Sequence, residues 1–373
     1  MRPARVLHVA KVKGIGGCER HLLTLLPSLS ATGMAVRLLV LEAGEDERRF
    51  VAQAWDAGID MERAPAGADG DPRAISAVTA AIRRFSPDVV HTHLIHADLW
   101  GQLAARRAGV PGVRSLHNVM PAYRRAPAGQ VGRMVGRLAT RSIAISSFVA
   151  AYARRFRLAP ADRIRVVPYG VDVDAWAVTD EERAQERQRL DLADEDVVVG
   201  MASRLVDGKG HAMALDAMGR ARGAVPELRM MIAGEGPLRP SLERGASALT
   251  ARASFLGQVD DMPRFMGACD LLLFPTLPGL GEGFGLAALE AMAAGVPVVA
   301  TGVGALPEVV EHGVTGSVVG PSAEAIAVAL VRLGGDRDER ASMGKAGCER
   351  AATTFGIDAM VARTVDVYRE ATA

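Results

Sequence analysis

Short runs rich in β-branched residues alternate with longer amphipathic stretches along the chain, and this alternation constrains the fold more than any other feature. The runs read RVLHVA, VRLLVLE, DVVHTH, VRSLHN, SIAIS and RIRVVPYG, and then VVVGMA, LRMMIAG, ASFLG, LLLFPT, VPVVA and GSVVG. Such an alternation is typical of a parallel sheet covered by helices on both faces. The sequence therefore predicts an α/β fold.

The charged stretch DEERAQERQRLDLADED at 180–196 interrupts this rhythm once, and 373 residues exceed what one core normally holds. We expect two Rossmann-like doubly wound domains, 1–172 and 173–354, facing each other across a cleft. A closing helix at about 355–373 should pack back on the first domain. Because ligands of such sheets bind at the carboxyl ends of the strands, we expect the functional site in the cleft.

Composition excludes several classes of protein. A chain that is 49% hydrophobic is too apolar for disorder, and a net charge of +1 gives no global field for nucleic acid. The N-terminal RPARVLHVA enters a strand without the apolar stretch of a signal peptide, so we expect a cytoplasmic protein. The cysteines match no metal-site spacing and favour a reducing compartment: Cys18, Cys269 and Cys348.

The stretch GEGFGLAALEAMAAG at 281–295 places two glutamates around a predicted helix start. The glycines at 279, 281, 283 and 285 predict a turn loop and Leu286–Ala294 a helix. With the helix beginning near Phe284, the amides of Phe284, Gly285 and Leu286 have no intrahelical partners, which predicts a phosphate site. Carboxylates repel phosphate, so Glu282 and Glu290 fit better as acceptors for hydroxyl groups attached to it, as in a nucleotide sugar. In the alternative interpretation, Glu282 is a solvated loop charge and Glu290 only stabilises the helix dipole.

Two further stretches could bind phosphate. Arg204 and Lys209, five residues apart after a predicted strand, can aim two cations at one diphosphate, although an isolated pair at this spacing is more often solvated. In KVKGIGGCER, Gly16 and Gly17 open a helix and could let the backbone approach a phosphate, but the segment lacks the third glycine of GxGxxG. A plain tight turn explains these glycines equally well.

The histidines include one candidate site residue and one group whose spacing suggests a metal site. His117 ends the run VRSLHN, where a strand should meet the cleft. In HTHLIH, alternation puts His91 and His93 on one strand face, with Asp98 the nearest acid. We therefore expect no metal.

Arginine is concentrated between residues 121 and 170, a segment that contains ten arginines and one acidic residue, Asp162. In GQVGRMVGRLATR the apolar Val131, Met134, Val135 and Leu138 should share one helical face. The ordinary interpretation is a packed helix with a solvated rim. The alternative is that the 124–165 segment contacts an anionic membrane or a phosphorylated acceptor.

The chain resembles glycosyltransferase family 4, a family of retaining enzymes with the GT-B fold. The stretch EGFGLAALE, followed by AMAAGVPVVAT and ALPEVVEHGVTGSVV, closely resembles the family signature. The stretches GMASRLVDGKG, IAGEGP at 232–237, FLGQV at 255–259, PYGVD and KGIGGCER resemble further family landmarks.

The resemblance implies transfer of a hexosyl group from a nucleoside diphosphate sugar, UDP-sugar favoured over GDP-sugar, to a hydroxyl of a saccharide, lipid or small molecule. It implies no metal, no other cofactor and no nucleic-acid partner. The implied catalytic residues are Glu282, on the transferred sugar, and His117 beneath it, while Glu290 binds the ribose. The remaining residues are implied on the diphosphate: Gly16, Gly17, Arg204, Lys209 and the amides of Phe284, Gly285 and Leu286.

Three positions depart from the family pattern. Tyr169 replaces the asparagine before GVD, Ala305 replaces a glycine, and Asp207-Gly208 replaces a proline–acid pair. These departures remove no charge that transfer needs, but they obscure the substrate. Two alternatives stay open: a nucleotide-sugar epimerase or phosphorylase of similar shape, and a catalytically silent saccharide-binding partner. A cytoplasmic enzyme of this kind could also make peripheral contact with the inner face of the membrane.

Overall fold

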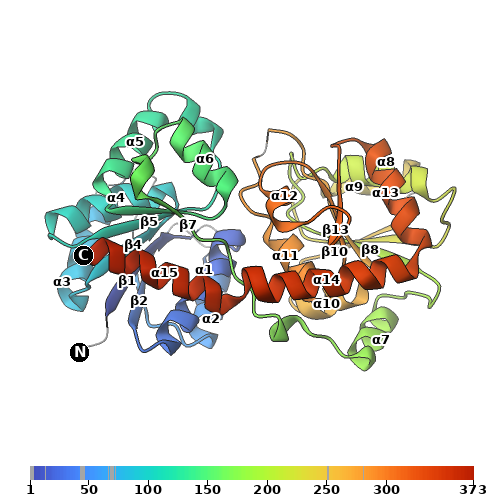
Figure 1. The fold of residues 1–373 in the computed structure, drawn as a ribbon, viewed down its shortest axis with the longest axis horizontal. Coiled ribbons are helices and arrows are strands. Elements are labelled where there is room, and N and C mark those ends of the chain that lie inside the picture. The colour runs from blue at the N-terminus through green and yellow to red at the C-terminus, as the bar shows by residue number, and fades with distance from the viewer. Residues whose placement is uncertain are drawn as a thin grey trace. The chain divides into compact units, whose positions relative to one another are not determined.

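The protein forms two compact units, which Figure 1 shows in a computed structural model. The structure describes residues 4–12, 14–42, 47–65, 67, 71, 73–249, 252–279 and 281–373. Unit 1 comprises residues 1–170 and 357–373, and unit 2 comprises residues 171–356. The sequence interpretation placed the corresponding boundaries at 172 and 354, each two residues away.

Unit 1 is built on a seven-stranded parallel sheet in the order β3-β2-β1-β4-β5-β6-β7. Its strands are β1 (Arg5–Lys11), β2 (Ala35–Glu42), β3 (Met61–Pro65), β4 (Val89–His93), β5 (Gly112–Leu116), β6 (Arg141–Ala144) and β7 (Ile164–Val166). Its helices are α1 (Gly17–Ala31), α2 (Arg48–Asp56), α3 (Arg73–Phe85), α4 (Leu94–Arg107), α5 (Ala128–Leu138), α6 (Ser147–Arg155) and α15 (Ile357–Thr372), with 3-10 turns Pro121–Arg124 and Ala161–Arg163.

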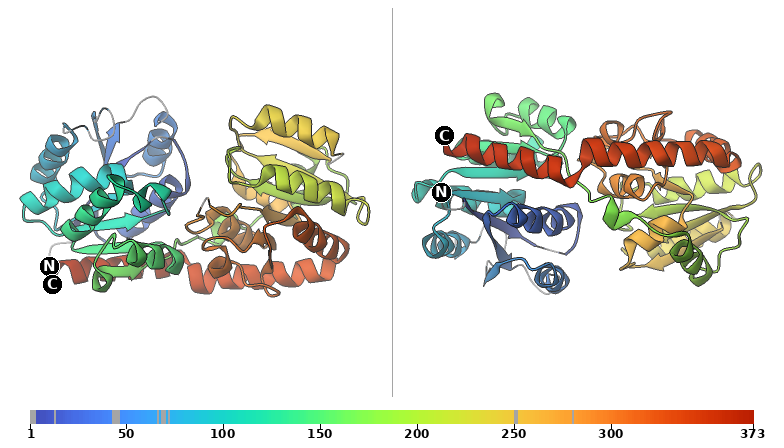
Figure 2. Two further views of the ribbon diagram at one scale, coloured as in Figure 1. Left: turned by 90° about the horizontal axis from the view of Figure 1, so that it is seen from above. Right: turned by 60° about the horizontal axis from the view of Figure 1, so that its bottom comes forward.

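Helices cover both faces of this sheet, as the buried strands require. Side chains alternate along β1, so Val6 and Ala10 join a core with α1, α2 and α15, while Leu7 and Val9 join a second core with α3 and α4. The helix α15 returns from the far end of the chain and packs beside α1 (Figure 2). Its Tyr368 is buried in the first of these cores.

Unit 2 repeats the architecture with a six-stranded parallel sheet in the order β10-β9-β8-β11-β12-β13. Its strands are β8 (Val197–Ala202), β9 (Leu228–Ala233), β10 (Ala253–Gly257), β11 (Leu271–Phe274), β12 (Val298–Thr301) and β13 (Gly316–Val319). Its helices are α7 (Asp180–Arg189), α8 (His211–Ala221), α9 (Arg239–Ala248), α10 (Met262–Ala268), α11 (Leu286–Ala293), α12 (Leu306–Val309), α13 (Ala323–Gly335) and α14 (Arg337–Phe355), with a 3-10 turn Asp174–Trp176.

The expected fold of two Rossmann-like doubly wound domains is confirmed, and every run singled out in the sequence contains a strand. The sequence analysis missed β3, which reads MERAP at the edge of its sheet. No residue of β3 is fully buried, so it lacks the apolar signal by which the other strands were found.

The strand order reverses between β1 and β4 in unit 1 and between β8 and β11 in unit 2. At such a switch point the two adjacent connections leave in opposite directions and open a crevice at the carboxyl ends of the strands. The loops that follow β1, β8 and β11 carry most of the predicted site residues.

Candidate active site

The switch point of unit 2 brings a cation and an acid together. Lys209 lies in the loop between β8 and α8, and its Nζ donates to Oε2 of Glu282, in the loop after β11, at 2.8 Å. Only 20% and 16% of the two side chains are exposed. Arg204, at the start of the same loop, is exposed and makes no ion pair with the described residues. One cation is thus paired with the predicted sugar-binding acid, and the other is available to an anion.

Glycine is required where the Lys209 loop crosses the end of β11. Gly210 has a φ of +78°, and a side chain there would overlap the carbonyl oxygen of Pro275. The Gly208 carbonyl accepts from the amide of Leu277 at 2.8 Å. These backbone contacts fix Lys209 beside Glu282 although 73 residues separate them.

The helix after Glu282, predicted over Leu286–Ala294, is α11, Leu286–Ala293, and Gly285 with a φ of +95° is its N-cap. The Phe284 ring is buried against Phe355, so this residue belongs to the packed loop and its amide is not part of the first helical turn. The first intrahelical bond is donated by the Ala288 amide to the Gly285 carbonyl, so the amides that precede it are those of Gly285, Leu286 and Ala287.

Glu290 lies in the second turn of α11 and is 5% exposed. The alternative interpretation made Glu282 a solvated loop charge, but its side chain is only 16% exposed and is paired with Lys209. Glu282 precedes the same helix, so one loop and helix carry both predicted carboxylates.

A neighbouring loop, which the sequence analysis did not assign to the site, supports Glu282. The amide of Ala305 donates to the Glu282 carbonyl at 3.0 Å. Gly304 has a φ of +66°, and a Cβ there would overlap the same carbonyl. A Cβ at Gly285 would overlap the side chain of Leu306, which therefore packs directly against this glycine. The sequence signal was present in ALPEVV, but only the fold shows which loop these residues support.

In unit 1, the backbone contacts and conformation of the glycines after β1 differ from those of the predicted phosphate-binding turn. The Gly16 amide donates to Oε2 of Glu19 at 2.9 Å, so a protein carboxylate already pairs with the first of the predicted phosphate-binding amides. Neither Gly16 nor Gly17 has a positive φ, and a Cβ at Gly17 would meet open space. Gly14, with a φ of +116°, is the residue in this turn whose conformation requires glycine.

His117 sits in a group of buried aromatic side chains at the carboxyl ends of β1, β4 and β5. Its Nδ1 lies 2.7 Å from the Tyr169 hydroxyl, and its Nε2 lies 3.0 Å from Nδ1 of His93. His21 of α1 stacks on Tyr169 with 4.4 Å between ring centroids. Tyr169, at which the chain departs from the family pattern, therefore orients the predicted catalytic histidine.

Burial keeps these imidazoles neutral. It lowers the pKa of His8 and His21 to about 3. It also lowers the pKa of His91, His93 and His117 well below the ordinary value of 6.5, and the neighbouring histidines add to this effect.

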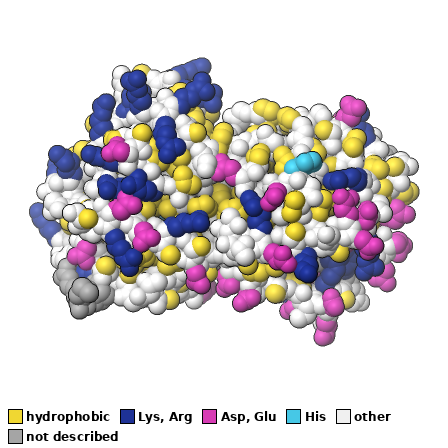
Figure 3. Space-filling model, viewed as in Figure 1, with side chains coloured by type: hydrophobic (Ala, Val, Ile, Leu, Met, Phe, Trp, Pro, Cys, Tyr) yellow, Lys and Arg dark blue, Asp and Glu magenta, His cyan; other side chains and the backbone are white. Residues whose placement is uncertain are grey.

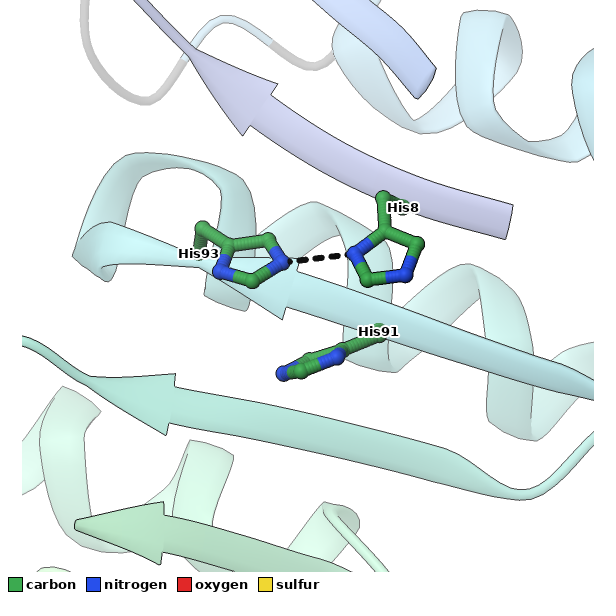
Figure 4. Close-up of side chains that lie close together, drawn as sticks. All are labelled: His8, His91 and His93. Atoms are coloured by element: carbon green, nitrogen blue, oxygen red, sulfur yellow. Dashed lines mark hydrogen bonds between the residues drawn. The ribbon is translucent and has the colours of Figure 1, made fainter. Parts of the chain in front are cut away.

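The strand register adds a histidine that the sequence analysis did not connect with HTHLIH. His8 of β1 lies opposite His91 of β4, and it points with His91 and His93 into one cluster (Figure 4). Their ligand atoms lie within 4.8 Å of one another, a spacing that could hold a metal ion. The ring nitrogens are, however, engaged in hydrogen bonds, and Asp98 lies on the other face of β4, where it accepts from Thr92.

The packed face of α5 differs in part from the predicted apolar face. Val135 is buried as expected, but Gly132 and Gly136 supply the rest of the contact with Tyr123 and Leu158, and Met134 is 46% exposed. Arg141 lies in β6 and pairs with Glu370. Figure 3 shows Lys and Arg side chains gathered over α5 and α6. Their exposed members are Arg124, Arg125, Arg137, Arg154, Arg155 and Arg157.

Comparison with known proteins places the chain in a class. Residues 15–175 match the family model described as Glycosyltransferase Family 4, and residues 196–336 match Glycosyl transferases group 1. The structure of Anabaena HepE in complex with UDP-glucose superposes with a TM-score of 0.85 at 23% identity, over 97% of this chain and 98% of that chain. The fold is therefore that of the GT-B glycosyltransferases.

Two curated relatives of the chain are glycosyltransferases with more specific names. The D-inositol 3-phosphate glycosyltransferase of Xylanimonas cellulosilytica is 31% identical over 96% of this chain and 92% of its own length. The GDP-mannose-dependent alpha-(1-6)-phosphatidylinositol monomannoside mannosyltransferase of Mycobacterium tuberculosis is 35% identical over 60% of this chain. That match spans 61% of the mycobacterial enzyme. The chain belongs to glycosyltransferase family 4. Among its described residues, no helix is both long and apolar enough to cross a bilayer.

Proposed function

We propose that the protein is a retaining glycosyltransferase that moves a hexosyl group from a nucleoside diphosphate sugar to an acceptor hydroxyl. The observation that carries the proposal is the convergence of Lys209, Glu282 and α11 at the switch point of unit 2. Cations and helix amides suit a diphosphate, and carboxylates suit sugar hydroxyls.

In this proposal, Arg204, Lys209 and the first amides of α11 bind the diphosphate, Glu290 binds the ribose, and Glu282 and His117 contact the transferred sugar. When the diphosphate binds, its negative charge competes with Glu282 for Lys209, which frees the carboxylate for a sugar hydroxyl. Stabilisation of the departing diphosphate by these cations removes the need for a metal.

A UDP-sugar is our first candidate donor, in line with the ligand of HepE, and GDP-mannose is the second, in line with the mycobacterial relative. For the acceptor we propose an anionic molecule or headgroup that contacts the exposed arginines of α5 and α6. Sedimentation with vesicles tests this surface: binding should require anionic lipid and weaken as salt rises. Equal binding to neutral vesicles would contradict it.

A ligand panel tests the donor site. Nucleoside diphosphates and their sugars, at about 100 times Kd, should add ~2.7 kcal/mol to the free energy of unfolding and raise Tm by several degrees. Lys209→Ala should lose this shift because the diphosphate loses a cation. Lys345→Ala removes an exposed lysine of α14 in the same unit and should keep it. An unaltered shift in Lys209→Ala would refute the phosphate role.

A transfer assay separates the remaining functions. The acceptor should receive the sugar with retained configuration, at an equal rate with and without EDTA. An altered sugar formed without acceptor would identify an epimerase, and phosphate-dependent release of a sugar phosphate would identify a phosphorylase. A donor that stays intact with every acceptor would identify a silent binding partner.

A further inference from the structure

A continuous line of hydrogen bonds runs through the core of unit 1. One of its ends is Tyr169, next to His117, and the other is Ser115. Its successive distances are 2.7, 3.0, 2.9, 3.3, 2.7 and 2.8 Å. It links, in order, Tyr169, His117, His93, His8, Tyr368, His91 and Ser115. All of these side chains are at least 92% buried. We call this line the imidazole chain.

The number of ring protons restricts which tautomers the imidazole chain can adopt. A neutral imidazole has one N–H donor and one acceptor nitrogen, and each ring in the line uses both nitrogens. If His117 donates from Nε2, then His93 must accept at Nδ1 and donate from Nε2, and His8 must follow. The three rings therefore all carry the proton on Nε2 or all carry it on Nδ1.

The tyrosines set the direction. Hydrogen bonds with an O–H donor are typically shorter than those with an N–H donor. The Tyr169 hydroxyl lies 2.7 Å from His117, which fits donation by the phenol. Tyr368 lies 2.7 Å from His91 but 3.3 Å from His8, which fits donation to His91 and acceptance from His8. Both tyrosines thus favour one direction, from Tyr169 to Ser115, with every ring protonated on Nε2.

We propose that Tyr169, His93, His8 and Tyr368 are positioning residues that fix the ring plane and the tautomer of His117 through this one-way imidazole chain. The tautomer claim stands on the hydrogen bonds of unit 1, and its catalytic meaning rests on the proposed contact of His117 with the donor sugar. Both ring nitrogens of His117 are committed to the chain, so His117 presents a fixed neutral ring to the sugar and does not act as a general acid or base.

Substitution of Tyr368 by phenylalanine gives a sharp expectation. In Tyr368→Phe, the original direction leaves the Nε2–H of His8 buried without an acceptor, whereas the reversed direction makes Tyr169 accept from His117 and costs the Tyr169 O–H its acceptor. Each direction then leaves one buried donor unpaired, so neither direction keeps the clear advantage it has in the wild type. The Nδ1–H tautomer should therefore become populated to the same extent in His8, His93 and His117, although only His8 touches residue 368.

The measurement is NMR of the protein labelled with ¹⁵N-histidine, without ligand, with ring signals assigned by single substitutions. Protonated and unprotonated nitrogens of a neutral imidazole resonate far apart, so each tautomer is read directly. The wild type should show Nε2–H in His8, His91, His93 and His117. Mixed tautomers among His8, His93 and His117, or a charged ring at pH 7, would overturn the proposal.

Tyr152→Phe is the matched control. The Tyr152 hydroxyl is also buried in unit 1, but it donates to the Met120 carbonyl, outside the imidazole chain. This variant should keep the wild-type tautomers. If Tyr368→Phe also keeps them while its spectrum stays folded, the proposal fails. Tyr169→Phe provides a second test if Tyr368→Phe does not fold. It should keep Nε2–H in the rings and shift only the Nδ1 signal of His117.

Binding separates this inference from the proposed function. In Tyr368→Phe, the affinity for the nucleotide sugar should fall by about three- to tenfold, because the imidazole chain no longer fixes one tautomer of the ring that faces the sugar, while the affinity for the bare nucleoside diphosphate stays unchanged. Equal loss for both ligands would refute the positioning role. If the wild type binds no nucleotide sugar, the proposed function fails, whereas concerted tautomers would still establish the imidazole chain.

Discussion

For individual residues, the pair Lys209–Glu282 decides the state of the loop after β11 before a ligand binds. The two side chains are mostly buried, and their N–O distance is 2.8 Å. The cost of desolvating two such charges offsets much of their attraction, so the pair is weak evidence for stability. In the proposed function its larger consequence is that Glu282 occupies the cation that the diphosphate needs.

Glu282→Gln should therefore separate binding from transfer. Without the carboxylate, Lys209 is released and the repulsion of phosphate is removed, so the bare nucleoside diphosphate should bind about three- to tenfold more tightly. Transfer should fall by about 100-fold, because a preorganised contact to the reacting sugar is lost. Calorimetry and initial rates measure the two effects, and weaker diphosphate binding would contradict the pairing.

At the scale of elements, the loop between β12 and α12 acts as a support for the loop that carries Glu282. Its glycine turn approaches the Glu282 carbonyl so closely that a side chain does not fit. Because a positive φ adds strain of about 1–2 kcal/mol for other residues, two glycines of unit 2 can be compared directly.

Gly304→Ala should lower the free energy of unfolding by about 3 kcal/mol or more and reduce transfer, because the new Cβ displaces the Glu282 loop. Gly313→Ala is the matched control. Gly313 has a similar φ of +79°, but its Cβ would meet open space, so we expect about 1 kcal/mol and normal transfer. Urea unfolding measures both changes. Equal losses would show that backbone strain alone, and not support of Glu282, explains this glycine.

At the scale of the whole molecule, the buried histidines give the two units different responses to acid. Burial lowers the pKa of five histidines in unit 1, and in unit 2 it lowers the pKa of His211 to about 4. The five are His8, His21, His91, His93 and His117. In the unfolded chain these groups titrate near 6.5, so below that pH the unfolded state binds more protons.

Unit 1 should therefore lose stability as the pH falls from about 6.5, by about 1.4 kcal/mol at pH 5.5 for each histidine that stays neutral. This loss is large beside a typical stability of about 5–15 kcal/mol. Hydrogen exchange at pH 7.5 and 5.5 should show unit 1 opening before unit 2. Similar protection of both units at pH 5.5 would contradict the buried, neutral state of the histidines.

Local patterns in the chain predicted the class of fold correctly and named most of the residues of the proposed donor site. Apolar periodicity located the buried strands because burial on both faces leaves a continuous apolar run, and it missed the edge strand β3 for the opposite reason. The spacing of Glu282 and Glu290 is local to one loop and helix, so it could be read directly. The predicted helix Leu286–Ala294 agrees with α11, whereas the packing of Phe284 against Phe355 is a tertiary contact that the local sequence does not show.

How these residues combine could not be read from local patterns and follows from the folding of the whole chain. His8, His91 and Tyr368 meet across separations of 83, 277 and 360 residues through strand register and the return of α15. Lys209 reaches Glu282 across the switch point of unit 2, and Gly304 supports it from a third loop. Local patterns encode burial and turns, whereas partners of this kind are fixed by which strands lie side by side, and that is a property of the folded chain.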